Sequence, residues 1–165
     1  ANPNIVKFWW DIDAAVIKAV KKRTPVTLNG LRFEYASGIL FIRLPSGRRL
    51  AYVKPRVEQN AYGRDSITYE GVGASKHWER IESYGPKFCE NIIQAYARDL
   101  LAAAIERLES AGYSIVMTVH DECVIEAPME ASVEEVCHIM SITPDWAKGL
   151  SVSAAGYECP FYQKE

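Results

Sequence analysis

The sequence lacks the features by which exported and membrane-spanning proteins are usually recognised. No apolar run approaches the roughly 20 residues that a membrane helix needs, and no charged-then-apolar leader opens the chain. The four cysteines contain no C-x-x-C pair, which argues against a zinc ribbon and against a dense disulfide framework. We therefore expect a protein of the reducing cytoplasm, without a membrane partner.

A strong excess of basic residues is also missing. The 19 Lys and Arg residues are balanced by 21 Asp and Glu residues, so the formal net charge is -2 over 165 residues. Proteins whose whole surface holds nucleic acid are usually strongly basic, so any nucleic-acid contact is expected to be a local patch. The 48% hydrophobic content is enough for a packed core at this length. We expect one folded unit without linkers or internal repeats.

Residues 1–25 have the pattern of a helix. Asn2 and Pro3 are typical of a helix N-cap followed by proline in the first turn. Apolar residues then recur at helical spacing to about Arg23. Pro25 follows at once and ends the predicted helix.

Residues 26–76 change to the pattern of a β-meander followed by a loop. From Val26 to Lys54, short apolar runs are separated by turn sequences such as Asn29-Gly30, which predicts antiparallel strands. The stretch 57–76 is polar and contains glycines, so we expect a loop with one short strand near residues 66–69. Basic residues in this region form either a solvated sheet edge or a phosphate-contacting strip. They are Arg43, Arg48, Arg49, Lys54, Arg56 and Arg64.

A long helix is predicted from Tyr84-Gly85-Pro86 to about Ser110. Four of its polar residues step by four, three and four positions and therefore share one face. They are Lys87, Asn91, Gln94 and Arg98. This face is either solvated or able to hydrogen-bond the minor-groove edge and sugar-phosphate of a duplex.

Two short apolar runs, 115–119 and 123–126, enclose the polar tripeptide His120-Asp121-Glu122. The pattern predicts a buried hairpin with a tight polar turn. Asp121 and Glu122 supply the carboxylate oxygens that magnesium prefers. Phosphoryl transfer by two metal ions needs such a cluster together with at least one further carboxylate from another element.

Other interpretations of this turn stay open. Its acidic residues are also common as simple turn-formers. A zinc site of His120, His138 and the cysteines lacks regular ligand spacing, and a hydrolytic pair of Cys123 with a histidine lacks an identified base. Downstream, a capping box predicts a helix from about Ser132 to Ser141, and a last strand is expected over residues 151–156.

Several strings of the sequence resemble family A DNA polymerases, the DNA polymerase I-like group. Val119-His120-Asp121-Glu122, about 25 residues after Gln94-Ala-Tyr-Ala-Arg-Asp99, resembles the last catalytic motif of that family. Other strings are similar to the short bacteriophage-encoded members in particular. They are Tyr84-Gly-Pro-Lys87, Leu44-Pro-Ser-Gly-Arg48, Asp145-Trp146 with Ala147-Lys-Gly149, and the ending from Gly156 to Tyr162. The similarity covers nearly the whole chain.

The resemblance implies an α+β fold in which an antiparallel palm-type sheet with a catalytic β-hairpin packs against long helices. It implies that Asp121 binds catalytic Mg²⁺, that His120 lies by the primer terminus, and that Glu122 is an auxiliary acid near the two metal ions. The implied partners are a DNA primer-template duplex and deoxynucleoside triphosphates. The candidate DNA contacts are Gln94, Asn91, Arg98, Lys87, Arg48 and Arg49.

Two motifs of the family are absent from the chain: the metal-binding D-Y-S-x-I-E and the nucleotide-binding R-x-x-x-K-x-x-x-Y-G. Both lie upstream in the family, and the chain begins with Ala1, so we expect a C-terminal fragment. Its parts would be helix 1–25, meander and loop 26–76, and palm portion 84–165.

The isolated fragment is expected to be inactive and, if phage-encoded, to reside in the host cytoplasm. Truncation is expected to expose apolar surface through which a second copy could bind, around Phe8, Trp9 and Trp10. The functional alternatives are a non-catalytic nucleic-acid-binding module and a metal-dependent nuclease.

Overall fold

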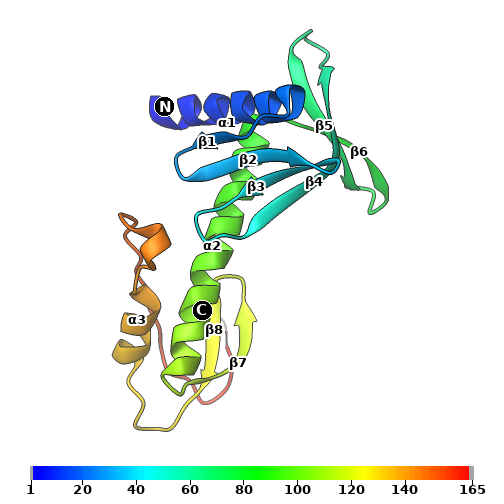
Figure 1. Ribbon diagram of the computed structural model, residues 1–165. Helices are drawn as coiled ribbons and strands as arrows, with labels where there is room; N and C mark the ends of the chain where they lie inside the picture. The colour runs from blue at the N-terminus through cyan, green and yellow to red at the C-terminus, as the bar shows by residue number, and fades with distance from the viewer. Residues whose placement is uncertain (1, 164–165) are drawn as a thin grey trace. The chain divides into compact units, whose positions relative to one another are not determined.

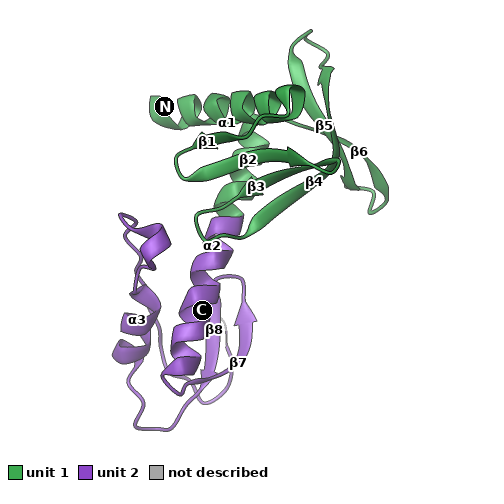
Figure 2. Ribbon diagram, viewed as in Figure 1, with its two compact units in different colours: residues 1–94 green, residues 95–165 purple. Residues whose placement is uncertain are grey.

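A computed structural model describes residues 2–163 of the chain. The chain forms two compact units, residues 1–94 and residues 95–165 (Figure 2). The boundary falls inside a helix, α2 (Gly85–Ser110), which is why no linker composition marks it in the sequence. Helices and antiparallel strands occur in both units (Figure 1), so the expected α+β class is confirmed.

The first helix of unit 1 begins and ends where the sequence predicted. In α1 (Pro3–Lys22), the Asn2 side chain caps the start by accepting a hydrogen bond from the Asn4 N–H at 3.1 Å. Arg23 follows the helix in the left-handed region, with φ 50°. The buried stripe comprises Ile12, Ala15, Val16, Ala19 and Val20, whereas the exposed apolar residues near the start are Ile5, Val6 and Trp10.

Unit 1 also contains a six-stranded antiparallel sheet in which each strand pairs with its neighbours in sequence. Its turns Asn29-Gly30 and Ser37-Gly38 have positive φ at both residues, as two-residue hairpin loops require. The predicted meander from Val26 to Lys54 is confirmed. The strands are β1 (Val26–Leu28), β2 (Leu31–Ala36), β3 (Ile39–Arg43), β4 (Arg49–Gln59), β5 (Asp65–Val72) and β6 (Trp78–Ser83).

The expectation that residues 57–76 form mainly a loop is wrong. β4 continues to Gln59, and β5 and β6 make a further hairpin. Their polar side chains find partners across the strands. Glu70 accepts a hydrogen bond from Lys54 at 2.8 Å and pairs with Arg80 at 3.3 Å, while Thr68 donates to Glu58 at 2.9 Å. Such cross-strand pairs stabilise strands whose residues resemble a loop when considered singly.

The core of unit 1 lies between α1, the sheet and the first turns of α2. The fully buried side chains there include Ile12, Phe33, Leu40, Ile42, Ile67 and Phe88. The start of α2 lies directly against α1, since any side chain at Gly85 would collide with the backbone oxygen of Trp9. Glycine is required at this position because of that close approach.

Unit 2 contains the C-terminal part of α2, a hairpin and a short helix. The hairpin strands are β7 (Ser114–Val119) and β8 (Glu122–Glu126). In α3 (Val133–Ser141), the Ser132 hydroxyl accepts a hydrogen bond from the Glu135 N–H at 3.3 Å, so the predicted helix start is confirmed. The 3₁₀-helix η1 (Asp145–Ala147) follows. Within residues 2–163, no helix combines the length and the apolar character that crossing a membrane would take.

The strand expected over residues 151–156 is not formed. The backbone N–H of Ala154 instead donates to the Ser141 hydroxyl at 3.0 Å. Gly156 lies beside Val133 and Cys137 of α3. Among the described residues the sheet of unit 2 has two strands, so this segment follows α3 instead of pairing as a third strand.

Candidate active site

The turn expected to carry catalysis is the tip of the β7–β8 hairpin. Val119 and Glu122 form the last register pair, which leaves His120 and Asp121 as a two-residue loop. The side chains of His120, Asp121 and Glu122 are exposed, and within the described part of the chain none of them forms a hydrogen bond or ion pair. The ladder therefore holds the backbone while an imidazole and two carboxylates face solvent.

His120 has an unusual backbone conformation, with φ 54°. The two-residue turns Asn29-Gly30 and Ser37-Gly38 of unit 1 have positive φ at both loop residues, with glycine second, whereas in the β7–β8 turn His120 alone has a positive φ. Two-residue loops with positive φ only at their first position ordinarily have glycine there, and another residue costs about 1–2 kcal/mol in this region. Strain of this kind is found where function or surroundings maintain it. Five other non-glycine residues among those described share a positive φ, so this conformation marks the turn without by itself separating His120 from a turn-former.

The expectation that this hairpin is buried is wrong. Ile115, Val124 and Ile125 are half-buried, Val116 is 55% exposed and Met117 is 41% exposed. Val116 is the extra residue of a β-bulge, where the register shifts between the two strands. In the described part of unit 2 the sheet consists of these two strands, and the Val116 and Met117 side chains stay exposed on it.

Arg98 of α2 is the candidate DNA contact that lies near the hairpin within unit 2. Its exposed guanidinium lies close enough to Cys123 of β8 to lower the pKa of that thiol, although burial has the larger effect and raises it overall. A thiol with a raised pKa is a poor nucleophile. The interpretation of Cys123 as a hydrolytic residue therefore gains no support.

Lys87 and Gln94, on the part of α2 that belongs to unit 1, already have a partner. Glu90 pairs with Lys87 at 2.8 Å and accepts a hydrogen bond from Gln94 at 3.3 Å. The hydrogen bond to Glu90 raises the pKa of Lys87. Sequence reasoning missed Glu90, although its spacing of three and four residues from these side chains signals a contact. A duplex on this face would have to replace Glu90.

Asn91 is tied to the core of unit 1. Its Nδ2 donates to the hydroxyl of Tyr52 at 3.1 Å, and the Tyr52 ring packs edge-on against Tyr69 and Phe88 at centroid distances of 4.9 and 5.1 Å. Burial raises the pKa of Tyr52 to about 12, against the opposing effect of the Asn91 hydrogen bond. No sequence pattern signals this pair, because 39 positions separate its members.

Arg48 and Arg49 lie where the β3–β4 turn enters β4, and both are exposed. The Arg48 N–H donates to the Ser46 hydroxyl at 3.4 Å. The Arg49 guanidinium lies 4.7 Å from the centroid of the Phe41 ring. Stacking on an aromatic ring holds this cation over the sheet.

The site offers few ligands for a metal ion. Among the described residues, no group of three or more His, Cys, Asp or Glu side chains could hold a metal ion. Asp121 and Glu122 adjoin each other and are chemically suited to supply two ligands of a hard cation, which needs more oxygens than these. His138 and the free cysteines join no such group, so the zinc interpretation has no support.

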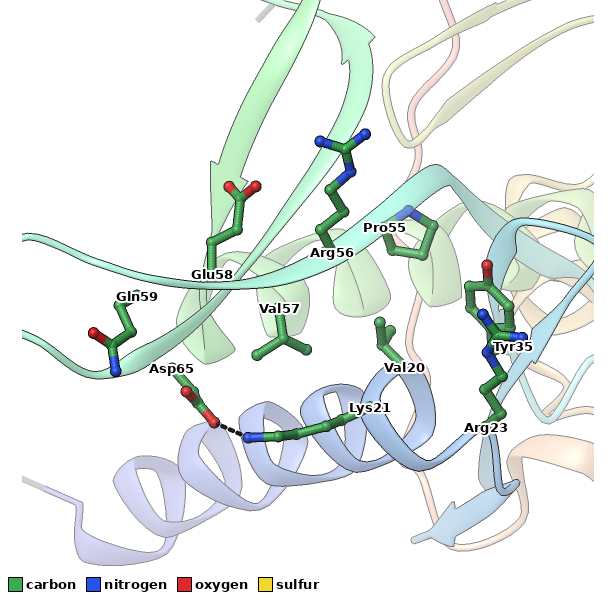
Figure 3. A pocket seen from close by; sticks show the side chains of 10 residues that line it. All are labelled: Val20, Lys21, Arg23, Tyr35, Pro55, Arg56, Val57, Glu58, Gln59 and Asp65. Carbon is green, nitrogen blue, oxygen red and sulfur yellow. Dashed lines mark hydrogen bonds and ion pairs between the residues drawn. The ribbon is translucent and has the colours of Figure 1, made fainter.

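A pocket of about 470 Å³ lies in unit 1, between the end of α1 and β4 (Figure 3). Lys21 and Asp65 pair across its mouth at 2.9 Å, and Arg23 stacks on Tyr35 at 5.1 Å. Figure 3 shows the side chain of Arg56 pointing away from α1. Arg56, a member of the basic strip that the sequence analysis named, is among the residues that line this pocket.

Comparison with known proteins finds a relative of the whole chain. A protein named DNA polymerase from Bacillus phage SP02 is 51% identical over 168 aligned positions, which cover 100% of this chain and 26% of that protein. The chain thus spans about a quarter of the length of the curated relative it matches. No protein-family model matches the chain. No solved structure matches it significantly.

Proposed function

We propose that the chain is the C-terminal part of a phage-type family A DNA polymerase and that its hairpin belongs to the palm. The carrying observation is the exposed, backbone-strained turn His120-Asp121-Glu122. The identity to a phage protein named DNA polymerase supports this assignment. The proposed activity of the parent is template-directed nucleotidyl transfer.

In this proposal the turn supplies part of a two-metal site. Magnesium, when bound, would stabilise charge on the attacking and leaving oxygens. Asp121 would hold the metal, Glu122 would act as an auxiliary acid beside it, and His120 would lie by the primer terminus. The remaining carboxylate would come from another part of the parent, since no such group of ligands forms within the described residues.

The proposed duplex contacts have unequal support. Arg98 is exposed and lies near β8, so it is the strongest candidate. Gln94 is exposed as well, but it donates to Glu90. Lys87 can bind a phosphate once Glu90 releases it. Asn91 acts through its hydrogen bond to Tyr52, so we assign it a positioning part. Exposed Arg48 and Arg49 would contact phosphates.

The metal assignment is tested in the full-length parent. Asp121→Ala should lower primer extension with magnesium on the order of a thousandfold, because a transition-state contribution of several kcal/mol is lost. Glu126→Gln, an exposed residue at the far end of β8, should leave extension unchanged. Normal primer extension by the Asp121→Ala variant, with its circular dichroism intact, would remove Asp121 from the metal site.

The isolated 165-residue chain is proposed to be inactive. Incubated with primer-template, magnesium and all four deoxynucleotides, it should leave the primer at its original length. Robust extension would contradict the incomplete-site proposal. Cleavage of DNA by this chain would favour the nuclease alternative instead, and a parent reading frame without the two upstream motifs would favour a non-catalytic binding module.

A further inference from the structure

We propose that the outer face of strands β2–β4 binds a single strand of DNA through a row of three arginines. Arg32 of β2 lies directly opposite Arg43 of β3, and Arg43 lies directly opposite Arg49 of β4. Residues that face each other across an antiparallel ladder point to the same side of the sheet. The register therefore aligns three guanidinium groups across three adjacent strands.

This row lies on the solvent face of the sheet in unit 1. The alternating neighbours Leu31, Phe33 and Ile42 are buried on the other face, in the core with α1. All three arginines of the row are exposed. Since adjacent strands are about 4.8 Å apart, the row extends about 10 Å across the sheet.

The row is unfavourable for the folded chain by itself. Like charges directly opposite each other on a sheet destabilise it. Glu34 pairs with Arg32 at 2.9 Å, but the side chain of Arg43 has no hydrogen bond or ion pair within the described residues. The Arg49 guanidinium lies over Phe41 instead of beside a carboxylate. An anionic ligand would remove the repulsion that the fold leaves uncompensated.

The surroundings of the row favour a nucleic-acid strand as that ligand. Arginine presents a planar fork that suits phosphate oxygens. Phe41 is directly opposite Glu34 and Ala51, in the next row of the same face, and the guanidinium stacked on it can stack a base on its other side. Sheet faces that combine cations with aromatic rings are typical platforms for unpaired bases. The proposed ligand is therefore single-stranded DNA.

This surface is separate from the proposed catalytic turn and from the α2 residues. It rests on the proposed function only for the choice of DNA over other polyanionic strands. Binding is measured on the chain itself and needs no catalysis. Failure of the polymerase assignment and failure of this surface are therefore distinguishable.

The test is binding of a fluorescent 20-mer of deoxythymidine to the 165-residue chain, followed by anisotropy at several salt concentrations. The double variant Arg43→Gln/Arg49→Gln should bind on the order of tenfold more weakly, and the slope of log K against log salt should flatten by about 1.4, or 0.7 for each lost phosphate contact. The matched control is Arg64→Gln, because the Arg64 side chain is exposed, has no partner among the described residues and lies in the β4–β5 turn off the row.

The outcomes separate the possible occupants. Loss in the double variant with Arg64→Gln unchanged, and circular dichroism intact in both, supports the proposal. Equal loss in all variants, no binding by the wild type at low salt, or no loss in the double variant overturns it. A duplex bound more tightly than the single strand, or poly-glutamate bound with the same loss, would assign the row to another partner and also overturn it.

Discussion

Unit 1 and unit 2 differ in how much apolar side chain they bury. In unit 1 the large, fully buried side chains come from α1, the sheet and α2, whereas among the described residues of unit 2 Leu108 stands alone in that class. Its other buried apolar residues are Leu101 and the alanines Ala95, Ala104 and Ala147. The proposed chemistry belongs to the thinly packed unit. Scaffold and candidate active site thus occupy different units of one chain.

Several large apolar side chains of unit 2 are exposed. Val116 and Met117 of the hairpin are exposed, and Phe161 and Tyr162 near the end of the chain are 68% and 45% exposed. Single exposed apolar side chains are also present in unit 1, Trp10 and Trp78 among them, so the two units differ in their buried side chains and not in their exposed ones.

The largest effect expected from this comparison is a core truncation in unit 1. Phe33→Ala should lower the free energy of unfolding by about 3–5 kcal/mol, because a fully buried aromatic side chain is removed. Val116→Ala in unit 2 should change it by less than about 0.5 kcal/mol. Urea unfolding followed by circular dichroism measures both. Equal losses would show that the units do not differ in packing as described.

Hydrogen exchange is the next test and needs no mutation. The paired amides of β3, which has a neighbour strand on each side, should exchange about a hundredfold more slowly than those of β8, which pairs only with β7. The expected reason is that unit 2 opens locally without unfolding unit 1. Similar protection of both strands, measured by mass spectrometry or NMR, would mean that the chain opens as one unit.

A smaller effect is expected at the strained turn. His120→Gly should raise the free energy of unfolding by about 1 kcal/mol, because glycine adopts positive φ without strain. Ser37→Gly in unit 1, with φ 50°, is the matched control and should stabilise similarly. In the full-length parent only His120→Gly should also slow primer extension. Slower extension in both variants, or in neither, would separate the strain from the proposed function.

The smallest effect concerns the half-buried carboxylate of Asp13 in α1. Burial raises the pKa of Asp13, the Gly85 N–H lowers it in part, and Oδ1 has no partner within the described residues. A carboxyl group whose pKa is higher in the folded than in the unfolded protein stabilises the fold while it is protonated, and this contribution is fully present below its unfolded pKa of about 4. The contribution is lost as the pH rises through the folded pKa.

From pH 3 to 7, therefore, Asp13→Asn should gain stability relative to the wild type by a few tenths of a kcal/mol. The comparison variant is Asp11→Asn, at a half-buried position of the same helix that pairs with Lys7 at 2.6 Å. Removing that pair should give no such gain in urea unfolding. A relative loss for Asp13→Asn with rising pH would contradict the assigned sign.

Local chemistry in the sequence was sufficient to predict much of the fold. The caps at Asn2 and Ser132, the Asn29-Gly30 turn and the His120-Asp121 tip depend on residues within a few positions of each other. Each of these features appears where it was expected. The sequence alone also showed which candidate metal ligands lie at the tip of the hairpin, although their roles stay proposals.

Contacts between distant residues decided the rest. β5 and β6 are strands because their polar side chains pair across the sheet. Residues 151–156 form no strand because they do not pair with either strand of the sheet in the described part of unit 2. Tyr52 holds Asn91 from 39 positions away, and the arginine row depends on strand register. The sequence by itself determined the caps, the turns and the chemistry of the tip. Tertiary structure decided burial, pairing and charge alignment, because these depend on which surfaces meet.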